Sequence, residues 1–102
     1  MPKTNRFDTV YVDTIPEGYK MEEGLLYISK KHSQVNHLCA CGCRKQVPMG
    51  LKPFWKDGWE LIEDANKNSF NNITLRPSIG NFKGENPYHA HYYITNNKVE
   101  WL

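Results

Sequence analysis

Three cysteines, Cys39, Cys41 and Cys43, fall within a five-residue stretch of a chain that is 102 residues long. An odd number of thiols does not fit a disulfide framework, and the polar N-terminus lacks the apolar run of a secretory signal. Thiols gathered in a reducing compartment are typical of metal binding, with redox chemistry as the second explanation. We therefore expect a cytoplasmic protein in which a metal ion binds these cysteines.

Zinc is the metal that this pattern favours. It takes four Cys or His ligands in a tetrahedron, with sulfur about 2.3 Å from the metal, so the thiols must converge. Alternate residues of a straight strand lie about 6.6 Å apart, so convergence requires a bend, which Gly42 can supply. A remote ligand is also needed if one loop does not supply all four. The expected ligands are Cys39, Cys41, Cys43 and His91, with His37 and His89 as alternates.

The size and charge of the chain limit its organisation and its partners. We expect residues 1–102 to form a single zinc-binding domain, with a flexible end at residues 1–6. Thirteen basic and eleven acidic side chains leave a net charge of +2, which gives no large field to attract nucleic acid. The apolar runs, such as Leu25–Ile28, are far shorter than the roughly 20 residues that span a bilayer. Neither nucleic acid nor a membrane is therefore an expected partner.

Alternating apolar and polar residues predict a mainly β fold, a small domain of antiparallel hairpins stapled by the zinc site. The hairpin signal is strongest at Asn96-Asn97, because asparagine tolerates a positive φ and the pair separates two alternating runs. Helical spacing occurs only weakly, from Trp59 to Ala65, and long loops are expected at 53–58 and 80–87. The expected strands are 7–12, 25–30, 34–39, 59–63, 73–76, 92–95 and 98–101.

Four blocks of sequence stand out between Gly24 and Trp101. They are His37-Leu-Cys-Ala-Cys-Gly-Cys43, Thr74-Leu-Arg-Pro-Ser-Ile-Gly-Asn81, His91-Tyr-Tyr-Ile94 and Lys98-Val-Glu-Trp101. In this order and spacing they resemble the bacterial domain-of-unknown-function family 6527, a small metal-binding domain found beside ubiquitin-like conjugation genes. The resemblance implies a zinc-dependent peptidase or isopeptidase that processes or deconjugates a ubiquitin-like protein. The family has a cysteine three residues before the histidine of the third block, where this chain has Tyr88, and His89 could compensate.

The catalytic candidates depend on how the zinc is ligated. Four protein ligands would close the site and favour a structural role, whereas three would leave a position for water. In the second case the zinc-bound water would attack a peptide or isopeptide carbonyl, and Glu100, on the strand paired with that of His91, would handle the proton. Ser78 is a second candidate, as a nucleophile, although the Pro, Ser, Gly and Asn residues in this block are also typical of a turn.

Two alternatives stay open. A cysteine nucleophile, Cys41 or Cys43 with His37 or His91 as its base, would compete with metal binding. The chain could also be a non-catalytic module in which zinc is structural and exposed aromatic residues bind a partner protein. Those aromatic residues would be Trp55, Trp59, Tyr92 and Trp101. The number of protein ligands on the metal would distinguish the enzyme from the module.

Overall fold

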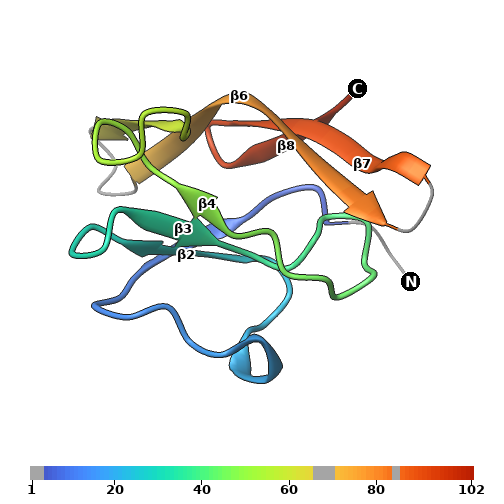
Figure 1. Cartoon of the computed structure of the whole chain (residues 1–102), viewed down its shortest axis with the longest axis horizontal. Coiled ribbons are helices and arrows are strands. Elements are labelled where there is room, and N and C mark those ends of the chain that lie inside the picture. Colours follow the sequence, from blue (N-terminus) through green and yellow to red (C-terminus); the bar gives the residue numbers. More distant parts are fainter. Residues whose placement is uncertain (1–3, 66–70, 84–85) are drawn as a thin grey trace.

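Two sheets face one another across a shared apolar core (Figure 1). The computed structural model describes residues 4–65, 71–83 and 86–102, and at residues 64–65, 71–72, 81–83 and 86–90 it describes the backbone alone. In this part of the chain each sheet has four strands, in the orders β1-β2-β3-β4 and β5-β6-β7-β8. The prediction of a mainly β fold is confirmed.

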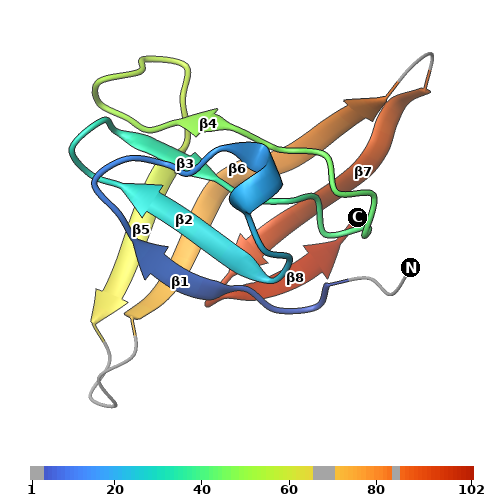
Figure 2. The ribbon, with the colours of Figure 1, turned by 90° about the horizontal axis from the view of Figure 1, so that it is seen from below.

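The first sheet comprises β1 (Asp8–Tyr11), β2 (Leu25–Ser29), β3 (Gln34–Asn36) and β4 (Met49–Gly50). Strands β2, β3 and β4 are antiparallel neighbours, whereas β1 runs parallel to β2. This parallel pair differs from the expected hairpins because a long connection, which includes the 3-10 helix η1 (Gly18–Lys20), returns the chain before β2 begins (Figure 2).

The second sheet comprises β5 (Glu60–Ala65), β6 (Asn71–Lys83), β7 (Asn86–Thr95) and β8 (Lys98–Trp101), all antiparallel. Asn96 and Asn97 have φ values of 49° and 69° in the turn between β7 and β8, so the predicted hairpin is confirmed. The long loop expected at 80–87 is wrong. The glycine and asparagine that suggested it pair with β7 in an irregular register, so the strands extend through most of this segment.

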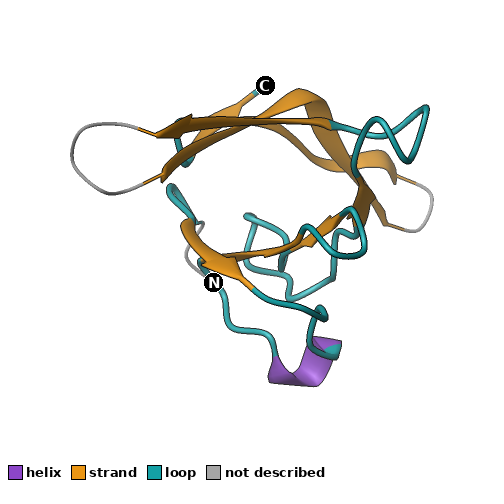
Figure 3. Cartoon of the chain, turned by 90° about the vertical axis from the view of Figure 1, so that its left-hand side faces the viewer, coloured by secondary structure: helices purple, strands orange, loops and turns teal. Residues whose placement is uncertain are grey.

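The core lies between the two sheets (Figure 3). Alternate side chains of β6 and β7 point into it, and Tyr92 and Ile94 of β7 are fully buried there. The first sheet contributes Leu26, Ile28 and Val35 from the opposite side. In the described part of the chain, no helix has both the length and the apolar character needed to cross a membrane.

Backbone bridges join the edges of the two sheets. Arg6 pairs with Lys98 beside β8, and Leu51 pairs in parallel with Trp59 just before β5. The amide of Thr4 also donates to the carbonyl of Ala40 at 2.7 Å. Within the segment 1–6 that is expected to be flexible, residues 4–6 therefore make backbone contacts with two distant segments. Residues 1–3 lie outside the described residues.

Candidate active site

Ser78 lies in an irregular part of β6. The register with β7 shifts between Leu75, which pairs with Ile94, and Ile79, which pairs with Tyr92. Pro77 has no N–H to donate to the ladder, so a bulge is an expected solution at this point of the strand. The turn that the sequence suggested here is thus an interruption within a long strand. A bulge changes the direction in which a neighbouring side chain points, and here that side chain is Ser78.

His91 meets the hydroxyl of Ser78 across the strand pair. The two atoms, His91 Nε2 and Ser78 Oγ, lie 2.7 Å apart, and both residues are half-buried. His91 pairs with Gly80, so it is a diagonal neighbour of Ser78 on the same face of the sheet. Its carbonyl accepts a hydrogen bond from the amide of Leu102 at 3.0 Å. This distance between a serine hydroxyl and an imidazole nitrogen is the one that a nucleophile–base pair of covalent catalysis requires.

Two further side chains hold the strands around this pair. The indole Nε1 of Trp59 donates to the carbonyl of Ser78 at 3.4 Å. Arg76 extends across β7, where its Nη1 donates to the carbonyl of Ile94 at 3.3 Å and its Nη2 donates to Thr95 Oγ1 at 2.8 Å. The guanidinium carbon also lies 4.6 Å from the centre of the Tyr93 ring. No role was expected for Arg76 or Thr95 from the sequence.

The three cysteines form a separate cluster. Their sulfur atoms lie within 4.8 Å of one another and could hold a metal ion, and Sγ of Cys39 is 3.4 Å from Sγ of Cys41. Gly42, with a φ of 90°, supplies the expected bend, and its amide donates to the carbonyl of Cys39 at 3.1 Å. Burial and hydrogen bonds with Cys43 and Cys39 raise the pKa of the Cys41 thiol to about 12. Without a cation this thiol stays protonated at neutral pH, which does not favour a cysteine nucleophile.

Of the predicted histidine ligands, His37 and His91 have described side chains. Neither belongs to the cluster of ligand atoms that the three cysteines form in the described part of the chain. His91 contacts Ser78, as above. His37 is fully buried, and its Nε2 lies 2.7 Å from the hydroxyl of Tyr92. Burial lowers the pKa of His37 to about 3, so the ring is neutral. The side chain of His89, the other alternate, lies outside the described residues.

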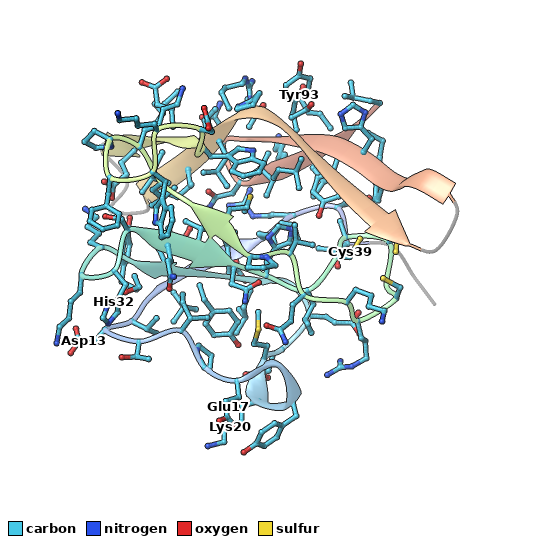
Figure 4. All side chains as sticks on the ribbon, viewed as in Figure 1. Asp13, Glu17, Lys20, His32, Cys39 and Tyr93 are labelled. Carbon is cyan, nitrogen blue, oxygen red and sulfur yellow. The ribbon has the colours of Figure 1, made fainter. Side chains whose placement is uncertain are left out.

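The serine–histidine pair and the cysteine cluster lie on opposite faces of the second sheet. His91 and Tyr92 are consecutive in β7, so their side chains point in opposite directions. The Tyr92 hydroxyl lies 3.4 Å from the amide of Ala40, inside the cysteine loop. In Figure 4, Cys39 lies between the sheets and Tyr93 lies on the outer side. Ser78 and His91 were each expected as site residues from the sequence, but their contact was not.

The remaining candidates take other positions. Glu100 lies on β8 opposite Tyr93, and its carboxylate accepts a hydrogen bond from Thr95 Oγ1. Of the four aromatic residues proposed for a partner surface, Tyr92 is fully buried, so that expectation is wrong for it. Trp59 and Trp101 are half-buried against the core, and Trp55 is 45% exposed.

A family model described as the bacterial ubiquitination-like system serine protease (BubE) matches residues 11–102. No curated protein and no solved structure matches the chain. The match confirms the expected association with peptidases of bacterial ubiquitin-like systems. It corrects the prediction of a zinc hydrolase, because the family description names a serine protease and no metal. Since the match covers most of the sequence, the chain belongs to the family of bacterial ubiquitination-like system serine proteases.

Proposed function

We propose that Ser78 is the nucleophile and His91 the general base of a serine protease that cleaves bonds made by a bacterial ubiquitin-like protein. The 2.7 Å contact between Ser78 Oγ and His91 Nε2 carries this proposal. The family description supports this proposal independently of the geometry, because the description names a serine protease of a ubiquitination-like system. Three cysteines that form no disulfide in the described structure favour action in the reducing cytoplasm.

The pair would act by covalent catalysis. His91 Nε2 accepts the hydroxyl proton as Ser78 Oγ attacks the carbonyl at the end of the ubiquitin-like protein. His91 then gives the proton to the leaving amine, and the acyl group remains on Ser78. Water, deprotonated by His91, attacks the acyl ester, the carboxylate leaves, and His91 returns the proton to Ser78 Oγ. The substrate would be a peptide or isopeptide bond, so the protease would process or deconjugate its partner.

We also propose that the cysteine cluster holds a structural zinc ion. Three thiols that converge in one loop are the soft donors that zinc takes in structural sites. The zinc would supply a cation that favours the thiolate forms and would fix the loop against β7. Cys39, Cys41 and Cys43 would hold it, and His89, whose side chain lies outside the described residues, stays the expected alternate for a fourth ligand that would close the site. This role leaves the proton transfers to Ser78 and His91.

A fluorophosphonate probe tests the nucleophile without knowledge of the substrate. The serine oxygen displaces fluoride from phosphorus, and mass spectrometry of the digested protein locates the adduct. We expect one adduct per chain, on Ser78, none in Ser78→Ala, and labelling slower by about a thousandfold in His91→Gln. The matched controls Ser33→Ala and His32→Ala should label at the rate of the unaltered protein. An adduct on another serine, or unchanged labelling in His91→Gln, would overturn the assignment.

The substrate is tested with a ubiquitin-like protein from the same system fused through its C-terminus to a reporter protein. We expect the unaltered protein to cleave the fusion at the junction and Ser78→Ala to leave it intact. Labelling of Ser78 without cleavage of this fusion would retain the nucleophile and reject the substrate. Tight binding of the fusion without either reaction would favour the non-catalytic module.

A further inference from the structure

A pocket with a volume of about 430 Å³ lies beside β3, β4 and the loop that leads to β5. Most of its wall is apolar, and the charged residues in the lining, Lys56 and Asp57, have opposite signs. A pocket of this size and composition is typical of sites for small apolar groups. The apolar lining residues are Ile15, Val35, Pro48, Met49, Trp55 and Trp59.

Two glycines allow the loop to close tightly beside this pocket. A Cβ atom on Gly50 would lie 2.5 Å from the Trp55 ring, so the indole lies directly against the backbone of β4. A Cβ atom on Gly58 would lie 2.3 Å from the carbonyl oxygen of Gly50. Neither position can accept a larger residue without movement of the loop. The position of the Trp55 ring is therefore fixed by the backbone on which it rests.

The same loop leaves two aromatic side chains exposed. Phe54 is 71% exposed and Trp55 is 45% exposed, and their ring centres are 5.4 Å apart in an edge-to-face arrangement. Adjacent exposed aromatic residues at the opening of a pocket indicate a binding surface rather than a solvated face. Because the nearby charges are balanced, the pocket favours an uncharged apolar group.

Trp59 connects this pocket to the nucleophile. It lines the pocket, and its indole Nε1 donates to the carbonyl of Ser78. One side chain therefore separates the pocket wall from the backbone of the residue that attacks the substrate. An extended peptide advances about 3.3 Å per residue, so each residue of a chain bound at Ser78 extends its reach by that length.

We propose that this pocket binds an aromatic or branched aliphatic side chain of the protein substrate, a few residues from the bond that Ser78 attacks. The inference rests on the proposed function. Trp55 forms the outer wall and is the main specificity-determining residue. Trp59 forms the inner wall and keeps the bound side chain in register with Ser78.

The test uses internally quenched ten-residue peptides that span the cleaved junction of the ubiquitin-like fusion. Each of the four residues before the cleaved bond is replaced in turn by Phe, Leu, Gly or Asp. We expect Phe and Leu at one position to raise kcat/KM at least tenfold over Gly and Asp. Trp55→Ala should remove this preference, mainly through KM, and Trp55→Phe should restore part of it. The control is Tyr19→Ala, which removes an exposed aromatic residue outside the pocket lining and should keep the preference.

Binding to Ser78→Ala, measured by the quenching of tryptophan fluorescence, separates the pocket from the chemistry. If Ser78→Ala binds the peptides with the same apolar preference and the double variant with Trp55→Ala loses it, the pocket is supported. This holds even if the unaltered protein cleaves none of the peptides. The absence of cleavage would count against the proposed function alone. Cleavage by the unaltered protein with no side-chain preference, or with a preference that Trp55→Ala leaves intact, would overturn the pocket.

Discussion

Tyr92 joins β7, the strand of His91, to the cysteine loop. Its hydroxyl contacts His37 Nε2 at 2.7 Å and the amide of Ala40 at 3.4 Å. His37 Nδ1 is buried and has no hydrogen-bond partner in the described structure, so Tyr92 gives this ring its polar contact. A neutral, buried imidazole needs that contact, because water cannot replace it.

Tyr92→Phe should therefore lower the free energy of unfolding by about 1–3 kcal/mol, the usual cost of leaving a buried polar group without its partner. Urea denaturation, followed by circular dichroism, measures the change. The control is Tyr93→Phe on the outward face of β7, which keeps the ring under Arg76 and should alter stability by about 0.5 kcal/mol or less. Equal losses in the two variants would mean that the hydroxyl of Tyr92 contributes nothing specific.

The sequence identified the chemical candidates but not their pairing. Ser78 and His91 are 13 residues apart, and their contact depends on a strand register that the bulge at Pro77 shifts. One signal was available: Ile79 and Tyr92 are apolar or aromatic core residues, which leaves Ser78 and His91 on the outer face of their strands. The cysteine cluster was predictable because its members are close in sequence, so Gly42 alone allows them to converge.

Glu100 belongs to a chain of hydrogen bonds that links β8, β7 and β6. Its carboxylate accepts a hydrogen bond from Thr95 Oγ1, which accepts one from Arg76 Nη2. Arg76 lies two residues before Ser78, so this chain of contacts supports the bulge in β6 beside Ser78. A catalytic role of Glu100 in proton transfer stays a prediction, although the zinc hydrolase for which it was expected is corrected by the family match.

Glu100→Gln should therefore reduce the rate of fluorophosphonate labelling by about tenfold or less, because the amide oxygen can still accept from Thr95. Loss by a thousandfold, as expected for Ser78 and His91 variants, would instead place Glu100 in the proton transfer. Lys98→Gln, on the same strand, is the matched surface control and should label at the normal rate.

A polar link joins the two sheets at the β5 edge. The Tyr11 hydroxyl donates to Glu63 Oε2 at 2.6 Å, and Lys30 Nζ lies 2.9 Å from Glu63 Oε1. The bond from Tyr11, then that from Lys30, lowers the pKa of the Glu63 carboxyl. The stability that Glu63 contributes is therefore present above its ordinary pKa of about 4.5 and is lost as the pH falls through the lower, folded-state value.

The difference in unfolding free energy between the unaltered protein and Glu63→Gln should thus shrink as the pH falls below about 4.5. Solvent screening keeps this difference below about 1 kcal/mol, and 1 M salt should reduce it further. Urea denaturation at a series of pH values measures it, and Glu60→Gln on the same strand is the control. A difference that stayed constant from pH 6 to pH 3 would contradict a role for the ionised carboxylate.

Contacts between distant segments close the molecule. Thr4 bonds to Ala40, Arg6 pairs with Lys98, and Leu51 pairs with Trp59. Local pattern can predict a hairpin such as 92–101, because its strands are joined by two residues. It cannot predict these bridges, because each depends on how the two sheets pack. The parallel pairing of β1 with β2 was missed for the same reason.

Ala40 of the cysteine loop bonds to Thr4 and contacts the hydroxyl of Tyr92, so a metal in this loop should stabilise the whole domain. Structural zinc contributes about 10–16 kcal/mol of apparent binding free energy, which is comparable with or larger than the roughly 5–15 kcal/mol net stability of a domain. Removal of the metal by a strong chelator should therefore unfold the protein or lower its Tm by more than about 10 °C. Elemental analysis should find one zinc per chain, and Cys41→Ser should lose it.

Replacement of zinc by cadmium separates a structural from a catalytic metal. Cadmium also binds thiolates, so it should restore the melting temperature. Ser78 and His91 lie on the opposite face of the second sheet from the cluster. The reconstituted protein should therefore label with fluorophosphonate at a rate within about twofold of that of the zinc form. A restored fold with labelling reduced a hundredfold would show that the metal takes part in the reaction. Absence of stoichiometric metal, with an unchanged melting curve in chelator, would instead mean that the three thiols stabilise the loop without a cation.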